Sequence, residues 1–230
     1  EACNVKNVVE SANKSGLLKD LEDQQGQLEM CEKALADYME SKRRAFPRFY
    51  FVSTADLLDI LSNGNNPVKV MTHMNKCFQA IEKLTLDTNN PPAGKRPKAK
   101  AIVSCVGKET IPFKSEMALA GKVEEYMNLI IDKMRSELKL HCFDAMQAYG
   151  NPKPRHEWCF DWSSQLGLVV NQIYWCQEVE AAFDAIAAGD AGAMKRYSEQ
   201  QVAQITDLIA STRRNLDKPS RQKIMNMITI

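Results

Sequence analysis

Apolar residues recur at helical spacing along most of the chain, and this pattern predicts a mainly α fold. A long amphipathic helix is expected over residues 17–44, with one apolar side facing a partner. A short helix is expected over 54–63, and the turn Asn63-Gly64 ends it. Asn66 and Pro67 are suited to cap and open a third helix that runs to about residue 84. Its expected buried stripe is Met71, Met74, Phe78 and Ile81.

The second half of the chain shows the same periodicity over longer distances. Residues 115–149 predict the longest helix, whose length would be ~50 Å at 1.5 Å per residue. A strongly apolar helix follows Trp158 and ends near Gly189, and another is expected over residues 191–217. Pro219 opens a last segment that ends on apolar residues. An uncovered apolar end predicts that the sequence is a piece of a longer chain. These last apolar residues are Met225, Met227, Ile228 and Ile230.

One region between these halves departs from the helical pattern. Residues 101–106 and 109–113 flank Gly107-Lys108 and predict the only β-hairpin, with Pro112 confining its second strand to an edge. The basic, proline-rich residues 87–100 predict a solvated loop, and contact of its basic half with a polyanion is the less favoured alternative. The expected fold is therefore an elongated helical-bundle rod with one small β-hairpin. Its expected parts are an N-terminal helical part, 1–86, a loop and hairpin, 87–114, and a long-helix bundle, 115–230.

The segment from Lys42 to Ser62 combines a charged helix end, a proline and a run of aromatic residues. Pro47 cannot continue the preceding helix and pushes Phe46 toward an extended conformation. We therefore expect a short extended passage, followed by a helix that Ser53 and Asp56 cap. The resulting joint would be held by aromatic burial, with Phe49, Tyr50 and the more distant Trp175 buried. The residues assigned to this structural or mechanical joint are Phe46, Pro47, Arg48, Phe49, Tyr50, Phe51 and Trp175.

Composition narrows the possible partners and compartment. The formal net charge is +1, which provides no global field for nucleic acid or a membrane surface. No apolar run approaches the ~20 residues of a membrane span, and the first residues do not resemble a signal peptide. The seven cysteines are odd in number and form no Cys-x-x-Cys pair, which is typical of reduced thiols in the cytoplasm. We therefore expect neither nucleic acid nor membrane as a partner.

A search for catalytic motifs gives no candidate. Gly107-Lys108 and Gly121-Lys122 lack both the upstream glycine and the following Ser or Thr of a phosphate-binding loop. His73, His141 and His156 form no helical metal-ligand pair. A Gly-x-Ser-x-Gly motif is also missing from the sequence. We expect no catalytic, cofactor-binding or metal-binding residue, and hence no enzyme activity, in this stretch of chain.

The whole string from Lys42 to Ser62 resembles the linker region of dynein heavy chains, which lies N-terminal to the AAA+ ring. Three further strings match the same pattern, and the resemblance covers roughly residues 27–223. The hairpin turn and the proline-rich loop depart from the family pattern, as does Tyr174-Trp175, where a Trp pair is usual. The spacing around residues 123–135 and 194–208 resembles the axonemal outer-arm type more than the cytoplasmic type. The three further strings are Cys31 to Leu35, Val123 to Met127 and Gln172 to Glu180.

The resemblance implies a mechanical linker, or lever, that bends and straightens over the AAA+ ring and drives minus-end-directed movement, as in ciliary beating. It implies that ATP and magnesium bind in the ring of the full-length motor ATPase and not in this stretch. Implied partners are the ring of the same chain, other dynein heavy, intermediate and light chains, and the microtubule in a cilium or flagellum axoneme. Residues 47–53 and 150–155 are candidate pivots or rigid corners. The alternative function is a non-catalytic helical scaffold or protein-interaction rod of a cytoskeletal protein.

Overall fold

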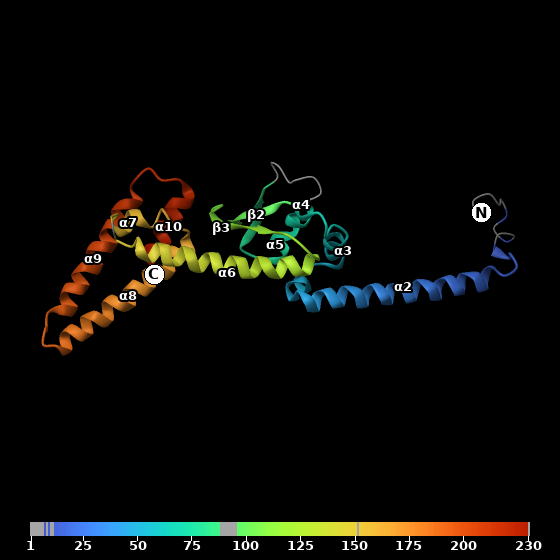
Figure 1. Cartoon of the computed structure of the whole chain (residues 1–230), viewed down its shortest axis with the longest axis horizontal. Coiled ribbons are helices and arrows are strands. Elements are labelled where there is room, and N and C mark those ends of the chain that lie inside the picture. The colour runs from blue at the N-terminus through green and yellow to red at the C-terminus, as the bar shows by residue number, and fades with distance from the viewer. Residues whose placement is uncertain (1–6, 8, 10–11, 88–95, 151, 230) are drawn as a thin grey trace.

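The computed structural model describes residues 7, 9, 12–87, 96–150 and 152–229, and they form an elongated molecule (Figure 1). Helix α2, Leu17–Ala45, projects from one end of the body. At the other end α8, Ser164–Ala187, and α9, Ala193–Thr212, extend side by side. The mainly α, elongated fold predicted from the sequence is confirmed. No helix among the described residues is both long and apolar enough to span a membrane.

A first hydrophobic core joins the end of α2 to a group of short helices and a sheet. Ser53 accepts a hydrogen bond from the Asp56 backbone N–H and so caps α3, as predicted. Asn66 caps α4 in the same way, and Pro67 occupies its first turn. The short helices are the 3-10 helix η2, Pro47–Phe51, then α3, Thr54–Ser62, α4, Pro67–Val70, the 3-10 helix η3, Met71–His73, and α5, Met74–Cys77.

The predicted third helix is wrong beyond Cys77. The chain leaves α5 through an extended Phe78 and forms strand β1, Ile81–Leu86. Strand β1 pairs antiparallel with β2, Lys98–Ser104, which pairs antiparallel with β3, Thr110–Ala118. The predicted hairpin is therefore β2 and β3 of a three-stranded sheet, and Pro112 lies on its edge strand as expected. The helical spacing of apolar residues was misleading here, because side chains from short helices and from the strand enter the same core. These residues are Met71, Met74, Phe78 and Ile81.

The predicted solvated loop is also shorter than expected. Residues 88–95 of this loop lie outside the described residues, but Ala99 in β2 is fully buried. Arg96 donates hydrogen bonds to the carbonyl oxygens of Leu119 and Gly121, at 3.3 and 2.6 Å, and to the side chain of Asn65. Arg96 of the loop is thus tied to the protein surface.

Helix α6, Val123–Gln147, connects the two ends of the body. It begins after β3, so the predicted start at Ser115 is wrong, and its 25 residues span ~37 Å. Its first turns, including the fully buried Tyr126 and Ile130, belong to the first core. Its last turns, including the fully buried Ala145, belong to a second core. One continuous helix therefore runs through both cores.

The second core lies between α6, α7 (Arg155–Trp158), α8, α9 and α10 (Lys218–Thr229). Trp158 is its largest buried side chain and donates from Nε1 to the carbonyl of Ala145 at 3.1 Å. The apolar end of the sequence, expected to be uncovered, is partly covered here: Met227 is buried together with Ile224, whereas Met225 is 44% exposed, and residue 230 lies outside the described residues. Helix α10 packs against α9 and α8, and α8 in turn packs against the end of α6, so all these helices share one core.

Candidate functional site

The aromatic joint is a tight, packed corner and not an extended passage. Phe46 is extended, with φ −135° and ψ 92°, but residues 47–51 form the 3-10 helix η2, and the chain is extended again only at Val52 and Ser53. Phe46 and Phe49 are fully buried and meet edge to face with ring centroids 4.8 Å apart. Phe78 completes the cluster beside Phe46 at 6.4 Å. A 3-10 turn with two buried rings fixes the angle between α2 and the first core.

The other predicted joint residues occupy the outer side of this corner. Arg48 donates a hydrogen bond to the carbonyl of Cys77 at 3.2 Å and places its guanidinium over the Phe78 ring. Tyr50 was predicted to be buried, but 53% of it is exposed, and its hydroxyl donates to Glu40 at 2.8 Å. Phe51 is 83% exposed. In a 3-10 helix, neighbouring side chains point in different directions, so only part of an aromatic run can enter the core.

Polar contacts reinforce the corner from α6. Lys42 near the end of α2 pairs with Glu124 in the first turn of α6, at 2.6 Å, and both side chains are nearly buried. The hydrogen bond that Lys42 donates to Glu124 outweighs the cost of burial and raises the pKa of Lys42. Asn128 donates to the carbonyl of Ala45 at 3.0 Å and so satisfies the end of α2. These contacts connect residues more than 80 positions apart, and no local sequence signal predicts them.

A second joint connects the two cores. Glu109, at the tip of the β2–β3 hairpin, accepts hydrogen bonds from the backbone N–H of Ser164, at 2.9 and 3.0 Å, and from its hydroxyl. Glu109 also pairs with Lys223 of α10 at 3.0 Å. The hairpin thus caps the first turn of α8 from a different part of the chain. Burial opposes the charge of Glu109, but the hydrogen bonds from Lys223 and Ser164 prevail and lower its pKa.

The hairpin reaches α8 because its turn contains two residues with positive φ, Gly107 at 72° and Lys108 at 52°. This turn is the one that departs from the pattern of the resembled family. Alongside it, the fully buried Glu137 of α6 pairs with Lys133 at 2.6 Å and accepts from the backbone N–H of Lys114 in β3 at 3.0 Å. The sheet is therefore fixed to α6 between the two cores.

Trp175 does not belong to the aromatic joint. It lies on α8 in the second half of the molecule and is 48% exposed, which contradicts the predicted burial. Helix α8 is apolar on several sides, so periodicity alone does not identify its core-facing residues. Of the second candidate pivot, residues 150–155, Asn151 lies outside the described residues. Arg155 begins α7 and donates to Gln204 of α9 at 3.1 Å.

Burial determines the chemistry of the cysteines in the two cores. The six described cysteines are free, and burial raises the pKa of Cys77 and Cys159 to about 11 in each case. Thiols with such values are poor nucleophiles at neutral pH. Among the described residues, no three His, Cys, Asp or Glu side chains are placed to hold a metal ion. The seventh cysteine, Cys3, lies outside the described residues.

This fold defines an elongated, mainly helical element. A projecting helix and two hydrophobic cores are held together by packed and hydrogen-bonded joints. Residues 1–145 match the family described as dynein heavy chain, N-terminal region 2, and the chain belongs to this family. It is 60% identical over 98% of its length to the dynein alpha chain of the flagellar outer arm of Chlamydomonas reinhardtii, of which it spans 5%.

Other dynein heavy chains are similar over nearly the whole sequence. Identity is 42% over 97% of the chain to the ciliary dynein beta chain of Heliocidaris crassispina, and 42% over 100% to human dynein axonemal heavy chain 17. The chain spans about 5% of the length of each of these relatives. The predicted resemblance to axonemal outer-arm dynein heavy chains is confirmed, and the relatives support an axonemal, cytoskeletal localisation.

Proposed function

We propose that this chain is a mechanical linker segment of an axonemal dynein motor. In this proposal the segment bends and straightens over the AAA+ ring of the same heavy chain and transmits ATP-driven movement toward the microtubule minus end. Its partners would be that ring, other dynein heavy, intermediate and light chains, and, through the complete motor, the microtubule. The segment itself would neither bind nor hydrolyse ATP, which would be bound with magnesium in the ring.

The continuous helix α6 is the observation that carries this proposal. It enters both hydrophobic cores, and α2 is fixed to its first turn by the Lys42–Glu124 pair and the Asn128 hydrogen bond. A displacement applied at one end of such a rod reaches the other end because close-packed cores deform little. A scaffold role would also use a rod, but it would place no demand on the stiffness of these joints.

Lys42→Met in a complete heavy chain separates these two roles. The variant keeps most of the side-chain volume but removes the charge that fixes α2 to α6. We expect microtubule gliding to slow by a larger factor than the basal ATP hydrolysis rate. Arg44→Met is the matched control, because Arg44 is highly exposed and pairs with Glu40 on its own helix. Unchanged gliding for Lys42→Met, in a preparation with a normal ATPase rate, would favour the scaffold role.

The proposed lack of nucleotide binding has a simpler test. Isothermal titration of the 230-residue chain with ATP and magnesium should give no binding heat. This expectation rests on the sequence, which contains no phosphate-binding loop. Saturable binding with micromolar affinity would overturn this part of the proposal.

A further inference from the structure

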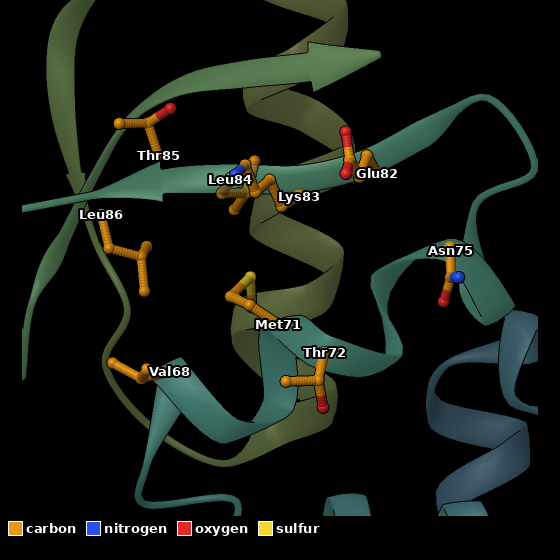
Figure 2. Close-up of a pocket in the computed structure, with 9 residues that line it drawn as sticks. All are labelled: Val68, Met71, Thr72, Asn75, Glu82, Lys83, Leu84, Thr85 and Leu86. Atoms are coloured by element: carbon orange, nitrogen blue, oxygen red, sulfur yellow. The ribbon is translucent and has the colours of Figure 1, made fainter. Parts of the chain in front are cut away.

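A pocket of about 540 Å³ lies between strand β1 and the short helices α4, η3 and α5 (Figure 2). Val68 and Met71 line it from the helical side, and Leu84 and Leu86 line it from the strand. Its size is within the range of ligand sites in proteins. The residues around its rim are polar, and they are Thr72, Asn75, Glu82, Lys83 and Thr85.

The pocket follows the edge of the sheet. Strand β1 is an outer strand in the order β1-β2-β3, so one of its edges has no strand partner among the described residues. All five consecutive residues from Glu82 to Leu86 line the pocket. Successive side chains of a strand point to opposite faces, so a pocket on one face would be lined by every second residue. Lining by consecutive residues places the backbone edge itself inside the pocket.

This geometry specifies the shape of an occupant. Between two register shifts, residues 83–85 pair regularly with β2. In such a strand, backbone N–H and C=O groups of alternate residues point toward the partner strand and toward the open edge. An extended peptide satisfies these groups by adding a fourth strand, and its alternate side chains then reach the pocket between β1 and the helices. A helix or a small apolar molecule would leave the backbone groups unsatisfied.

The charges at the pocket further limit the type of peptide that can bind. Glu82 is already paired with Lys108 at 2.6 Å, whereas the exposed Lys83 has no ion pair within the described ranges. The unpaired charge at the pocket is therefore positive, and an acidic residue in the added strand would complement it. An exposed lysine on an edge also disfavours pairing with a second copy of the same edge, because two like charges would meet.

We propose that the edge of β1 is a docking site for an extended peptide segment of a partner polypeptide, with alternating apolar residues and an acidic residue that faces Lys83. The proposal concerns a surface distinct from the α2 corner and from the Glu109 joint, and it does not depend on the lever function.

The test uses the whole 230-residue chain and a panel of fluorescein-labelled hexapeptides. Each peptide alternates Val or Leu with Thr, and one Glu is moved through all six positions. We expect one register to bind saturably in fluorescence anisotropy. Val68→Glu should weaken that binding by about tenfold or more, since it places a negative charge in the pocket. Val106→Glu is the matched control, because Val106 is highly exposed and does not line the pocket.

Two further measurements distinguish strand addition from adhesion of apolar side chains. N-methylation of the peptide amides that face β1 should abolish binding, whereas N-methylation of the alternate amides should leave it unchanged. Lys83→Glu should weaken binding of the Glu peptide and strengthen binding of its Lys counterpart. The proposal is overturned if no peptide binds below ~1 mM, or if both sets of N-methylated peptides behave alike. It is also overturned if sedimentation shows a dimer that Val68→Glu dissolves, since the occupant is then a second copy.

Discussion

The two joints of this molecule differ in the forces that hold them. The corner between α2 and the first core is hydrophobic, with Phe46 and Phe49 fully buried, and a nearly buried ion pair adds to it. The joint between the two cores has only one continuous element, α6, and is supplemented by the polar contacts of Glu109 at the hairpin tip. The first joint has the properties of a rigid corner. We expect that neutralising the single carboxylate of Glu109 loosens the second.

This difference has a consequence for how the rod responds to its surroundings. Burial of aromatic rings depends little on salt and pH. The ion pair and hydrogen bonds of Glu109, whose pKa is lowered, are sensitive to both. Variants at the two joints should therefore differ in the size of their effect and in the conditions that change it.

The largest effect is expected for Phe49→Ala at the corner. Removing this fully buried ring leaves a cavity beside Phe46 and should lower the free energy of unfolding by ~3 to 5 kcal/mol. Phe51→Ala, two residues away and 83% exposed, is the control and should change it by less than ~0.5 kcal/mol. Thermal melts followed by circular dichroism measure both. Equal melting temperatures for the two variants would show that η2 does not hold the corner.

The next effect in size concerns the ion pair behind the corner. Lys42→Met leaves the nearly buried carboxylate of Glu124 without a partner and should cost ~3 kcal/mol. Adding Glu124→Gln removes that charge, so the double variant should recover part of the lost stability. Chemical denaturation of the two single variants and the double variant gives the coupling energy. Additive losses would contradict a direct interaction between the two side chains.

A smaller effect is expected for Glu109→Gln at the joint between the cores. It weakens the hydrogen bonds that Glu109 accepts from Ser164 and the pair with Lys223, and it should lower the free energy of unfolding by ~1.5 kcal/mol. Glu116→Gln is the matched control, since Glu116 pairs with lysines at the exposed sheet edge.

The pH dependence of Glu109 has a definite sign. Its pKa is lowered in the folded state from the ordinary 4.5, so its stabilising contribution is complete above about pH 4.5 and is lost as the pH falls through the lower folded value. The difference in unfolding free energy between the natural chain and Glu109→Gln should therefore shrink on acidification. A difference that stays constant down to pH 3 would show that the charged form of Glu109 does not stabilise the joint.

The smallest effect is one of reactivity. At pH 7.5, iodoacetamide should modify the exposed Cys31 and Cys176 while the buried Cys77 and Cys159 remain unmodified. The raised pKa of about 11 means that these buried thiols stay protonated, and stability should decline as the pH rises from about 9 toward 11. Peptide mapping by mass spectrometry measures the labelling. Rapid modification of Cys77 in the folded chain would show that the first core opens readily.

Local signals in the sequence were sufficient for the elements whose ends are marked by residue chemistry. The α2 helix, the Ser53 cap and the Pro112 edge strand agree with the structure because each depends on neighbouring residues. Strand β1 was missed, although Leu84 and Leu86 alternate with Lys83 and Thr85. The helical spacing of the preceding apolar residues extended the predicted helix through it.

The contacts that form the joints depend on tertiary structure. Glu109 meets Ser164 and Lys223 only after three distant segments fold together, and Lys42 meets Glu124 across 82 positions. The predicted burial of Trp175 was wrong for a related reason. An apolar residue on a helix that is apolar on several sides can lie on either the core side or the outer side, and only packing decides.

The passage of α6 through both cores also bears on how the chain folds. Most of the stability of a helix in a protein comes from tertiary packing, so each half of α6 depends on the core that it enters. If one core opens, the backbone hydrogen bonds of the adjoining turns lose their packing, and fraying proceeds toward the other core. The amide protons near the middle of α6 should consequently exchange with deuterium when either core opens, and faster than the amide protons of the turns inside a core that stays closed.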